Sequence, residues 1–325
     1  MILKIQNLKV YFPVSGGKLF LRKRGDIKAV DDVNLSIKKG KIIGLVGESG
    51  CGKTTLARAV VGLAEKTSGK IFFDDINLDE IPKDIKQELK RKIQMIFQDP
   101  YLSLNPTMRV VDVVAEGLDV HGLVRDKEER EERVISLMET AELPDAAEIL
   151  YRYPAAFSAG ERQRIAIARA LAVNPFLLLC DEPVSSLDVL IQDEILKLFL
   201  SLRDKFNLSI LFISHDLAVV SNISDEVIVM YLGRIVEYAA RKELFTNPLH
   251  PYTKLLLSTV PIPDPLMARG RVRRDVKEEI MVSAENIPPG CRFHPRCPAA
   301  TKLCQETDPG LVDRGGGHLV ACHLI

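Results

Sequence analysis

The sequence lacks several features that mark other classes of protein. It contains no tryptophan, and only 6% of its 325 residues are aromatic, which disfavours a surface that stacks on nucleic-acid bases. Its 44 basic and 44 acidic residues give a net charge of +0, so no basic excess indicates a nucleic-acid partner. With 46% hydrophobic and 27% charged residues, the composition is typical of a soluble globular protein.

Long hydrophobic runs are also missing. The longest ones, such as residues 42–46 and 176–180, are far shorter than the ~18–20 residues that a membrane-spanning helix needs. Residues 1–10 alternate apolar and polar side chains and lack the apolar core and cleavage site of a secretory signal. We therefore expect a cytoplasmic chain, in which the six cysteines do not form a disulfide framework.

Signals for strands and helices alternate along much of the chain. Apolar spacing of two predicts strands at 3–11 and 34–37, and residues 41–46 read as a buried strand. The helix predicted at 53–63 places Leu56, Val60 and Leu63 on one face. Helices are also expected at 84–92 and 127–138, and alternation resumes over 175–229. This pattern predicts an α/β domain with a mostly parallel sheet, and residues 98–172 predict a helical insert.

The clearest motif is a glycine-rich loop between a predicted strand and a predicted helix. Glycines let successive backbone N–H groups turn toward phosphates, and the N-terminus of the following helix adds free donors. We expect Lys53 to reach the β- and γ-phosphates and Thr54 to bind Mg²⁺, with Thr55 beside them. The pattern G-x-x-x-x-G-K-[ST] is matched at every position by Gly47, Glu48, Ser49, Gly50, Cys51, Gly52, Lys53 and Thr54.

A second motif ends an apolar run with two carboxylates. Residues 176–180 predict a strand that is followed directly by Asp181 and Glu182. Ligands bind at the carboxyl ends of strands in open α/β sheets. Asp181 is suited to hold Mg²⁺ through water, and Glu182 to orient and deprotonate an attacking water. Together with the glycine-rich loop, this motif predicts a site that hydrolyses a nucleoside triphosphate.

The segment upstream of these carboxylates narrows the family. Residues 157–164 read Phe-Ser-Ala-Gly-Glu-Arg-Gln-Arg, which resembles the ABC ATPase signature Leu-Ser-Gly-Gly-Gln but departs from it at three positions. The resemblance implies that Ser158 and the backbone of Gly160 face the γ-phosphate of ATP bound to a second subunit. Ser158 and Glu161 also predict a capping box that opens a helix. Ala159 leaves less room for close approach, and its effect on hydrolysis stays open.

The other elements of the ABC family follow in order. The aromatic residue that stacks on adenine corresponds to Tyr11, with Phe12 as the alternative. A glutamine at Mg²⁺ and the attacking water corresponds to Gln98, and the loop that crosses to the other subunit ends at Asp188. A histidine at the γ-phosphate corresponds to His215. By resemblance, catalysis falls to Glu182, His215, Gln98 and Lys53, and Mg²⁺ binding to Thr54, Gln98 and Asp181.

The resemblance covers about residues 1–258 and implies the P-loop NTPase fold. This fold has a RecA-like core, an N-terminal antiparallel β subdomain and a helical signature subdomain, here at about residues 99–172. Each ATP would be held between two ATPase subunits, identical or sister chains, so that ATP closes the dimer and hydrolysis opens it. Two transmembrane permease subunits are implied as partners, which places the chain peripherally on the cytoplasmic face of the membrane.

Three features resemble the subfamily that imports dipeptides, oligopeptides and nickel. They are residues 98–106, residues 247–253 and a cysteine-rich C-terminal extension at 259–325. Import of di- or oligopeptides with an external binding protein is therefore expected. Import of nickel or an oligosaccharide stays open, because the permeases and the binding protein set selectivity. Glu182 and His215 argue against a purely regulatory subunit. A non-transport ABC ATPase is disfavoured by the single phosphate loop and the lack of long heptad runs.

The C-terminal extension begins with prolines at 261, 263 and 265 and a basic stretch at 269–274, and then carries four cysteines. Such a short segment would fold poorly without a crosslink, and in the cytosol a metal centre is favoured over disulfides. The resemblance points to a [4Fe–4S] cluster. Three histidines keep Zn²⁺ as an alternative, and unliganded thiols are a third. The residues concerned are Cys291, Cys297, Cys304 and Cys322, with His294, His318 and His323.

Overall fold

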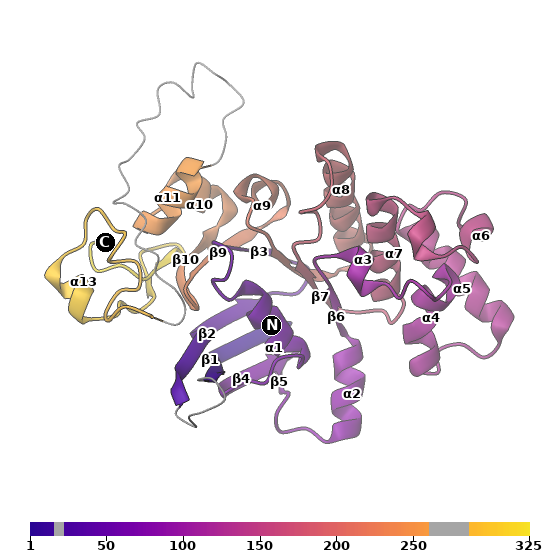
Figure 1. Cartoon of the computed structure of the whole chain (residues 1–325), viewed down its shortest axis with the longest axis horizontal. Coiled ribbons are helices and arrows are strands. Elements are labelled where there is room, and N and C mark those ends of the chain that lie inside the picture. The colour runs from indigo at the N-terminus through magenta and orange to yellow at the C-terminus, as the bar shows by residue number, and fades with distance from the viewer. Residues whose placement is uncertain (16–22, 260–285) are drawn as a thin grey trace, which may run out of the picture. The chain divides into compact units, whose positions relative to one another are not determined.

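The computed structural model of the protein describes residues 1–15, 23–259 and 286–325 (Figure 1). It divides into two compact units, each built from segments that are distant in the sequence. The glycine-rich, basic segment 15–26 predicts a loop, but residues 23–26 belong to a strand, and 16–22 lie outside the described residues. The prolines at 261–265 and the basic stretch at 269–274 also lie outside them. Unit 1 comprises residues 1–2, 37–42 and 73–213, and unit 2 comprises residues 3–36, 43–72 and 214–325.

Unit 2 begins with long strands. β1 (Leu3–Ser15) lies between β2 (Lys23–Ile37) and β4 (Ser68–Phe73) in one sheet. The strands predicted at 3–11 and 34–37 were too short. Alternating apolar residues indicate only the part of a strand that has one buried face. Near the end of β1 this pattern stops, since Phe12 is apolar but 42% exposed, so the pattern did not predict the full strand.

A second set of strands in unit 2 leads into the phosphate loop. β3 (Ile42–Val46) pairs in parallel with β9 (Glu226–Tyr231), and β10 (Arg234–Ala240) pairs antiparallel with β9. β12 (Leu319–Val320) and β11 (Val312–Asp313), from the C-terminal extension, continue this sheet beside β10. The last residues of the chain are therefore built into the same sheet as the strand before the phosphate loop.

The helices of unit 2 are short. α1 (Lys53–Val61) buries Leu56 and Val60, as predicted. The prediction that Leu63 shares this face is wrong: Leu63 is 62% exposed, because the helix ends at Gly62, whose φ is 77°. The other helices among the residues of this unit that the structure describes are α9 (Leu217–Ile223), α10 (Arg241–Thr246), α11 (Pro251–Thr259) and α13 (Lys302–Glu306).

Unit 1 contains the parallel strands that carry the predicted carboxylates. β7 (Leu177–Asp181) lies between β6 (Ile93–Ile96) and β8 (Ser209–Ile213), and both pairings are parallel. Every residue of β7 and β8 is buried, which explains their unbroken apolar runs. α8 (Val189–Phe206) connects β7 to β8, as a parallel pair requires. The predicted strand–helix alternation is confirmed here.

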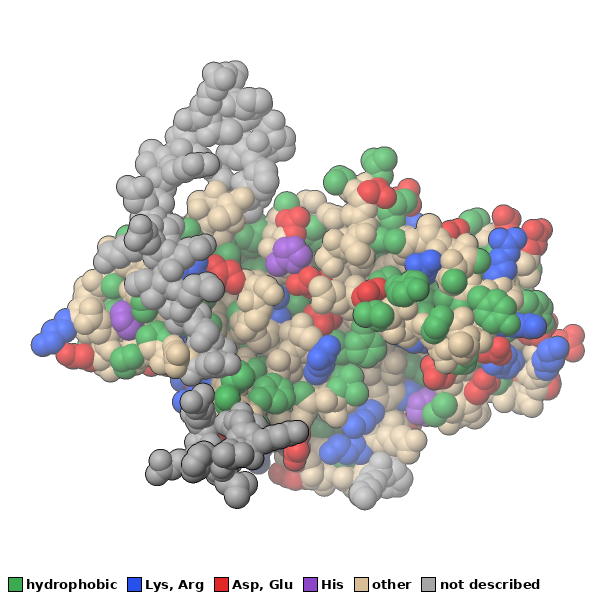
Figure 2. Space-filling model, in the orientation of Figure 1, with side chains coloured by type: hydrophobic (Ala, Val, Ile, Leu, Met, Phe, Trp, Pro, Cys, Tyr) green, Lys and Arg blue, Asp and Glu red, His purple; other side chains and the backbone are tan. Residues whose placement is uncertain are grey.

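Helices fill the chain between β6 and β7, and no strand occurs among residues 98–172, all of which the structure describes. The segments are α3 (Pro100–Ser103), α4 (Val110–Val120), α5 (Lys127–Thr140), α6 (Ala146–Ile149), a 3-10 turn at Pro154–Ala156 and α7 (Ala159–Leu171). α7 packs against α3, α4 and α5 (Figure 1). The visible face over α3–α8 carries charged side chains of both signs, with hydrophobic ones between them (Figure 2).

Two further elements of unit 1 precede these strands. β5 (Ile76–Asn77) and α2 (Lys83–Arg91) lie ahead of β6 in the chain. Across the described ranges, none of the helices is long and apolar enough to span a membrane.

Candidate active site

The phosphate loop has the backbone that its glycines predict. Gly47, Gly50 and Gly52 have φ values of 154°, 77° and 107°, in the region that L side chains rarely adopt. A Cβ on Gly47 would lie 2.2 Å from the backbone oxygen of Met230, and one on Gly52 would lie 2.0 Å from that of Ala29. Glycine is therefore required at these two positions by close packing as well as by the turn.

The loop ends at the N-terminus of α1, where backbone donors are available to an anion. Gly52 is the N-cap and has no side chain to cap the first turn, and that turn carries no acidic residue. Lys53 is buried, and its Nζ donates to the backbone oxygens of Gly47 at 2.7 Å and Glu48 at 3.1 Å. A lysine ammonium held on the loop backbone, beside the free N–H donors at the start of α1, fits phosphate binding, and Thr54 and Thr55 follow along the helix.

His215 lies close to the start of this loop within unit 2. The backbone N–H of Ser214 donates to the oxygen of Leu45 at 3.2 Å, two residues before Gly47. His215 itself is exposed, directly after this contact. The structure therefore brings the segment of His215 to the carboxyl end of β3, where the phosphate loop begins.

Tyr11 is held by its hydroxyl group. The hydroxyl donates to the carboxylate of Asp31, and the Nζ of Lys28 lies 5.7 Å from the centre of the ring. Burial and the hydrogen bond to Asp31 raise the pKa of Tyr11 to about 12, so the phenol stays neutral. A fixed, half-exposed ring fits the adenine platform that the sequence predicted.

Unit 1 brings two of the predicted catalytic side chains together. Asp181 ends β7 and is buried, and Glu182 follows with a φ of 47°. Left-handed backbone at a residue other than glycine costs about 1–2 kcal/mol. The N–H of Glu182 donates to the oxygen of Ile213 at 3.0 Å, and the Nε2 of Gln98 donates to the Glu182 carboxylate at 3.1 Å. The orientation of the Glu182 carboxylate is thus fixed by the backbone hydrogen bond to Ile213 and by the side-chain amide of Gln98.

The signature segment forms the predicted capping box at the start of α7. The N–H of Glu161 donates to Ser158 Oγ at 3.3 Å, and the N–H of Ser158 donates to the Glu161 carboxylate at 2.8 Å. The Ser158 hydroxyl also donates to the Glu161 carboxylate at 2.7 Å, and this hydrogen bond, with the one from the Ser158 N–H, lowers the pKa of Glu161. A Cβ on Gly160 would lie 2.7 Å from Ile191 Cγ2, so any larger residue here would have to displace this side chain of α8.

Asp188 has a local role that the sequence analysis did not identify. It is the N-cap of α8, and its carboxylate accepts the N–H groups of Leu190 and Ile191, each at 3.1 Å. An aspartate directly before an apolar helical run is the signal that could have predicted this cap. Because Ile191 also faces Gly160, the signature helix and the loop at Asp188 are packed together in unit 1.

The donors predicted for Mg²⁺ have suitable chemistry. The hydroxyl of Thr54, the carboxylate of Asp181 and the amide oxygen of Gln98 are hard oxygen ligands. Mg²⁺ usually keeps several waters and binds through one or two protein groups together with substrate phosphates. Thr54 belongs to unit 2, and the other two residues belong to unit 1.

The predicted metal centre in the C-terminal extension is not supported. No group of three or more His, Cys, Asp or Glu that could hold a metal ion occurs in the part of the chain that the structure describes, which includes all four cysteines. None of them forms a disulfide. Burial, with smaller contributions from Cys304 and Cys322, raises the pKa of the Cys291 thiol to about 11.

The histidines that kept zinc as an alternative have other partners. His318 Nε2 lies 2.7 Å from the buried carboxylate of Glu237. His294 Nδ1 lies 2.9 Å from the backbone oxygen of Cys291, and His323 Nε2 lies 2.8 Å from that of Thr307. Each of the three histidines that kept zinc as an alternative thus has a protein oxygen atom as its neighbour.

Two contacts to the phosphate loop were missed entirely. Tyr252, which the sequence analysis used only within the family marker at 247–253, accepts the backbone N–H of Glu48 at 2.9 Å. Arg296, between two of the cysteines, pairs with the Glu48 carboxylate at 2.8 and 2.9 Å. No local pattern indicates either contact, because the partners are 204 and 248 residues apart.

Comparisons with known proteins agree with this geometry. Residues 30–185 match a family model described as "ABC transporter", and residues 236–304 match "Oligopeptide/dipeptide transporter, C-terminal region". The oligopeptide transport ATP-binding protein AppF of Bacillus subtilis is 46% identical over 99% of this chain and 97% of its own length. The dipeptide transport ATP-binding protein DppF of Haemophilus influenzae is 43% identical over 100% and 97%.

Solved structures agree on the fold. The dimeric post-hydrolysis structure of the ATP-binding cassette MJ0796, bound to ADP and Pi, has a TM-score of 0.64 and 27% identity. It covers 74% of this chain and 98% of its own. The chain thus has the cassette fold of P-loop ATPases, and it belongs to the family of ABC transporter ATP-binding proteins of the dipeptide and oligopeptide type.

Proposed function

We propose that this chain is the ATP-hydrolysing subunit that energises import of di- or oligopeptides through separate membrane permeases. One observation carries the proposal: the same chain joins a complete phosphate loop at 47–54 to a match with the oligopeptide/dipeptide transporter C-terminal region at 236–304. Residues 1–258 would form the nucleotide-binding domain, with the helical insert at about 99–172, and residues 259–325 the extension.

Unit 2 would bind the nucleotide. The N–H groups of the loop and of the first turn of α1 would hold the phosphates, and Tyr11 would stack on adenine. Lys53 would exchange the carbonyl oxygens of Gly47 and Glu48 for the β- and γ-phosphate oxygens. His215 would contact the γ-phosphate. Bound Mg²⁺, held with Thr54, Asp181 and Gln98, would neutralise charge on the phosphates.

Unit 1 would supply the group that activates water. Glu182 would accept a proton from the attacking water, and the amide of Gln98 at 3.1 Å would keep its carboxylate oriented. The cost of the left-handed backbone at Glu182 supports this role, because such strain persists where a side chain must be aimed. Ser158 and Gly160 would face the γ-phosphate bound by a second ATPase subunit.

Exposed apolar side chains fit the proposed partners. Val189 and Leu190, directly after Asp188, are 78% and 79% exposed and would be covered by the second ATPase subunit. Tyr101 and Leu102, which follow Gln98, are 60% and 80% exposed and fit a contact with a permease. The chain would then lie peripherally on the cytoplasmic face, and an external peptide-binding protein would deliver the solute.

The test is Mg²⁺-dependent ATP hydrolysis by the wild-type chain and by Glu182→Gln, alone and with the permeases in liposomes. We expect Glu182→Gln to bind ATP with wild-type affinity and to hydrolyse it at least 100-fold more slowly. With the external peptide-binding protein also present, uptake of a labelled tripeptide into the liposomes should depend on ATP. Hydrolysis by Glu182→Gln at the wild-type rate would contradict the assignment of Glu182 as the base. ATP-driven uptake of nickel instead of peptide would contradict the proposal that the transported solute is a peptide.

A further inference from the structure

Arg296 of the C-terminal extension is fixed against the phosphate loop. Its two terminal nitrogens donate to the two carboxylate oxygens of Glu48 at 2.8 and 2.9 Å, which is a bidentate pair. The guanidinium also lies 5.8 Å from the ring centres of Tyr231 and Phe293. Its side chain is only 17% exposed. Two rings and two hydrogen bonds therefore hold one arginine on the second residue of the phosphate loop.

Arg292 precedes Arg296 by four residues and reaches the other end of the predicted nucleotide site. It is buried, pairs with Asp31 and donates to the backbone oxygen of Leu232. Asp31 in turn accepts the hydroxyl of Tyr11. Burial raises the pKa of Asp31, but the hydrogen bond from Tyr11 and the charge of Arg292 outweigh it and lower the pKa overall, so Asp31 stays ionised.

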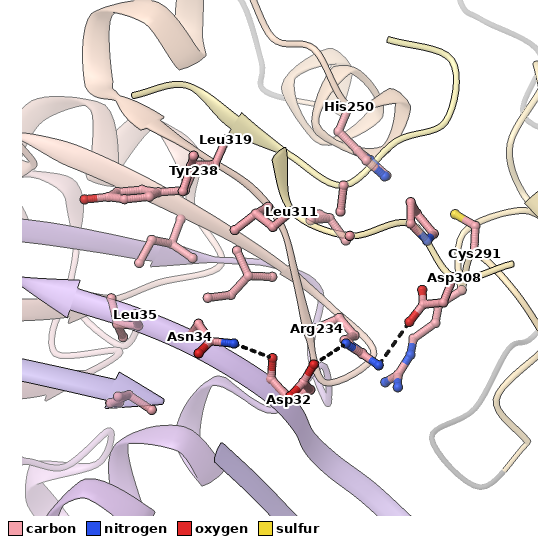
Figure 3. Close-up of a pocket in the computed structure, with 18 of the residues that line it drawn as sticks. Asp32, Asn34, Leu35, Arg234, Tyr238, His250, Cys291, Asp308, Leu311 and Leu319 are labelled. Carbon is pink, nitrogen blue, oxygen red and sulfur yellow. Dashed lines mark hydrogen bonds and ion pairs between the residues drawn. The ribbon is translucent and has the colours of Figure 1, made fainter. Parts of the chain in front are cut away.

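A third arginine strengthens the same junction. Arg234 of β10 lies between Asp32 and Asp308, at 3.2 and 3.0 Å (Figure 3). Asp32 belongs to β2 and is adjacent to Asp31, whereas Asp308 belongs to the extension. The extension is thus tied to β2 beside the carboxylate that holds Tyr11.

We propose that residues 291–297 position both ends of the nucleotide site: Arg296 holds and neutralises Glu48 in the phosphate loop, and Arg292 holds the ring of Tyr11 through Asp31. The inference rests on the proposed ATPase function and deepens it. Both arginines are positioning residues, because each acts through another side chain. The ligand they serve is a nucleoside triphosphate with its polyphosphate at Glu48 and its base at Tyr11.

The charge of Glu48 makes this role separable from simple anchoring of the extension. Without Arg296, an unpaired carboxylate would remain beside the phosphates and repel them. Glu48 is 42% exposed, so water screens part of this repulsion, and we expect ATP to bind about 5- to 10-fold more weakly. Removing the negative charge as well should restore binding.

The first experiment measures equilibrium binding of ATP and of inorganic triphosphate to the full chain carrying Glu182→Gln, which prevents turnover. In this background, Arg296→Gln should weaken both ligands, and Arg296→Gln with Glu48→Gln should bind within about 2-fold of the parent. Arg314→Gln, at an exposed arginine of the same extension, is the matched control and should leave binding unchanged.

The second experiment tests the arm at Tyr11. Tyr11→Phe keeps the ring but removes the hydroxyl that donates a hydrogen bond to Asp31. Arg292→Lys keeps the positive charge beside Asp31 but removes the guanidinium. Each should weaken ATP about 3- to 5-fold and leave inorganic triphosphate unchanged, because triphosphate has no base to stack. Thermal melting of each variant reports whether it is folded.

Several outcomes would overturn the inference. They are an Arg296→Gln variant that binds like Arg314→Gln, a double variant that is not rescued, or a Tyr11→Phe variant that weakens both ligands equally. If the parent chain binds ATP and any variant gives one of these results, the positioning role is overturned and the proposed ATPase function stays intact. A parent chain that does not bind ATP at all overturns the proposed function itself.

Discussion

The phosphate loop and the C-terminal extension form parts of the same unit, but their structures are specified in different ways. In the loop, eight consecutive residues carry the glycines, the lysine and the helix start that the geometry needs. In the extension, Arg292 and Arg296 lie outside its helix and strands, and they are held by partners far away in sequence, Asp31 and Glu48. A local motif can therefore be recognised directly, whereas a long-range ion pair becomes visible only after folding.

The buried carboxylate of Glu237 shows how the extension is fixed. It accepts the backbone N–H groups of Leu249 and His250 at 2.7 and 2.9 Å and contacts His318 at 2.7 Å. Glu237 follows an irregularity in the pairing of β9 and β10, a feature that re-aims side chains. One carboxylate with no solvent exposure thus joins β10, the turn before α11 and the extension.

The largest expected effect distinguishes two glycines within the phosphate loop. Gly52→Ala places a Cβ against the backbone of Ala29 at a φ of 107°, and should destabilise the chain by about 3–5 kcal/mol and abolish ATP binding. Gly50→Ala, with a φ of 77° and nothing within 4 Å of the new Cβ, should cost only about 1 kcal/mol. Urea unfolding measures both, and equal losses would contradict the role of close packing.

The next effect tests the anchor of the extension. Glu237→Gln puts an amide donor where two backbone N–H groups need acceptors, and we expect a loss of about 2–4 kcal/mol in the free energy of unfolding. Glu243→Gln is the control, because Glu243 is 47% exposed and its amide can still accept from Asn247. Thermal unfolding checks the pair, and a Glu237→Gln chain as stable as the control would refute the anchoring role.

The pH dependence of stability isolates His250. Burial lowers the pKa of His250 from 6.5 to about 4. As pH falls, the unfolded chain binds the proton first. The contribution of the neutral His250 to the free energy of unfolding is therefore complete above pH 6.5 and is lost between about 6.5 and about 4. From pH 7 to pH 5, the free energy of unfolding should fall by about 2 kcal/mol for this reason.

His250→Asn should remove this part of the pH dependence, because its Oδ1 can accept the N–H of Tyr252 in place of Nδ1. His121→Asn, at the C-cap of α4, should keep the wild-type dependence. Denaturant unfolding at the two pH values measures the difference, and an unchanged slope in His250→Asn would contradict the burial of a neutral imidazole.

The smallest expected effect concerns the signature helix. Ser158→Ala removes the cap of α7 and should cost about 1 kcal/mol in unfolding free energy. Ser201→Ala, at an exposed position within α8, should change stability by less than about 0.5 kcal/mol. Chemical unfolding of the two variants provides the comparison, and equal values would show that the capping box does not stabilise unit 1.

Much of the site was predictable, because its signals are local. The loop at Gly47, the apolar strand that ends in Asp181 and the capping box at Ser158 each depend on residues adjacent in the chain. The same applies to the alternation of strand and helix over 175–229. The misjudged end of α1 at Leu63 was local too, since Gly62 stops the helix and a glycine is a recognised stop signal.

The phosphate loop, the parallel strands and the helical segment could be read from the amino-acid sequence, since backbone conformation and one-sided burial follow from neighbouring residues. The contacts of Arg296 with Glu48, of Arg292 with Asp31 and of His318 with Glu237 became visible only in the folded chain. The physical reason is separation: these partners are 248, 261 and 81 residues apart, so no local periodicity records them.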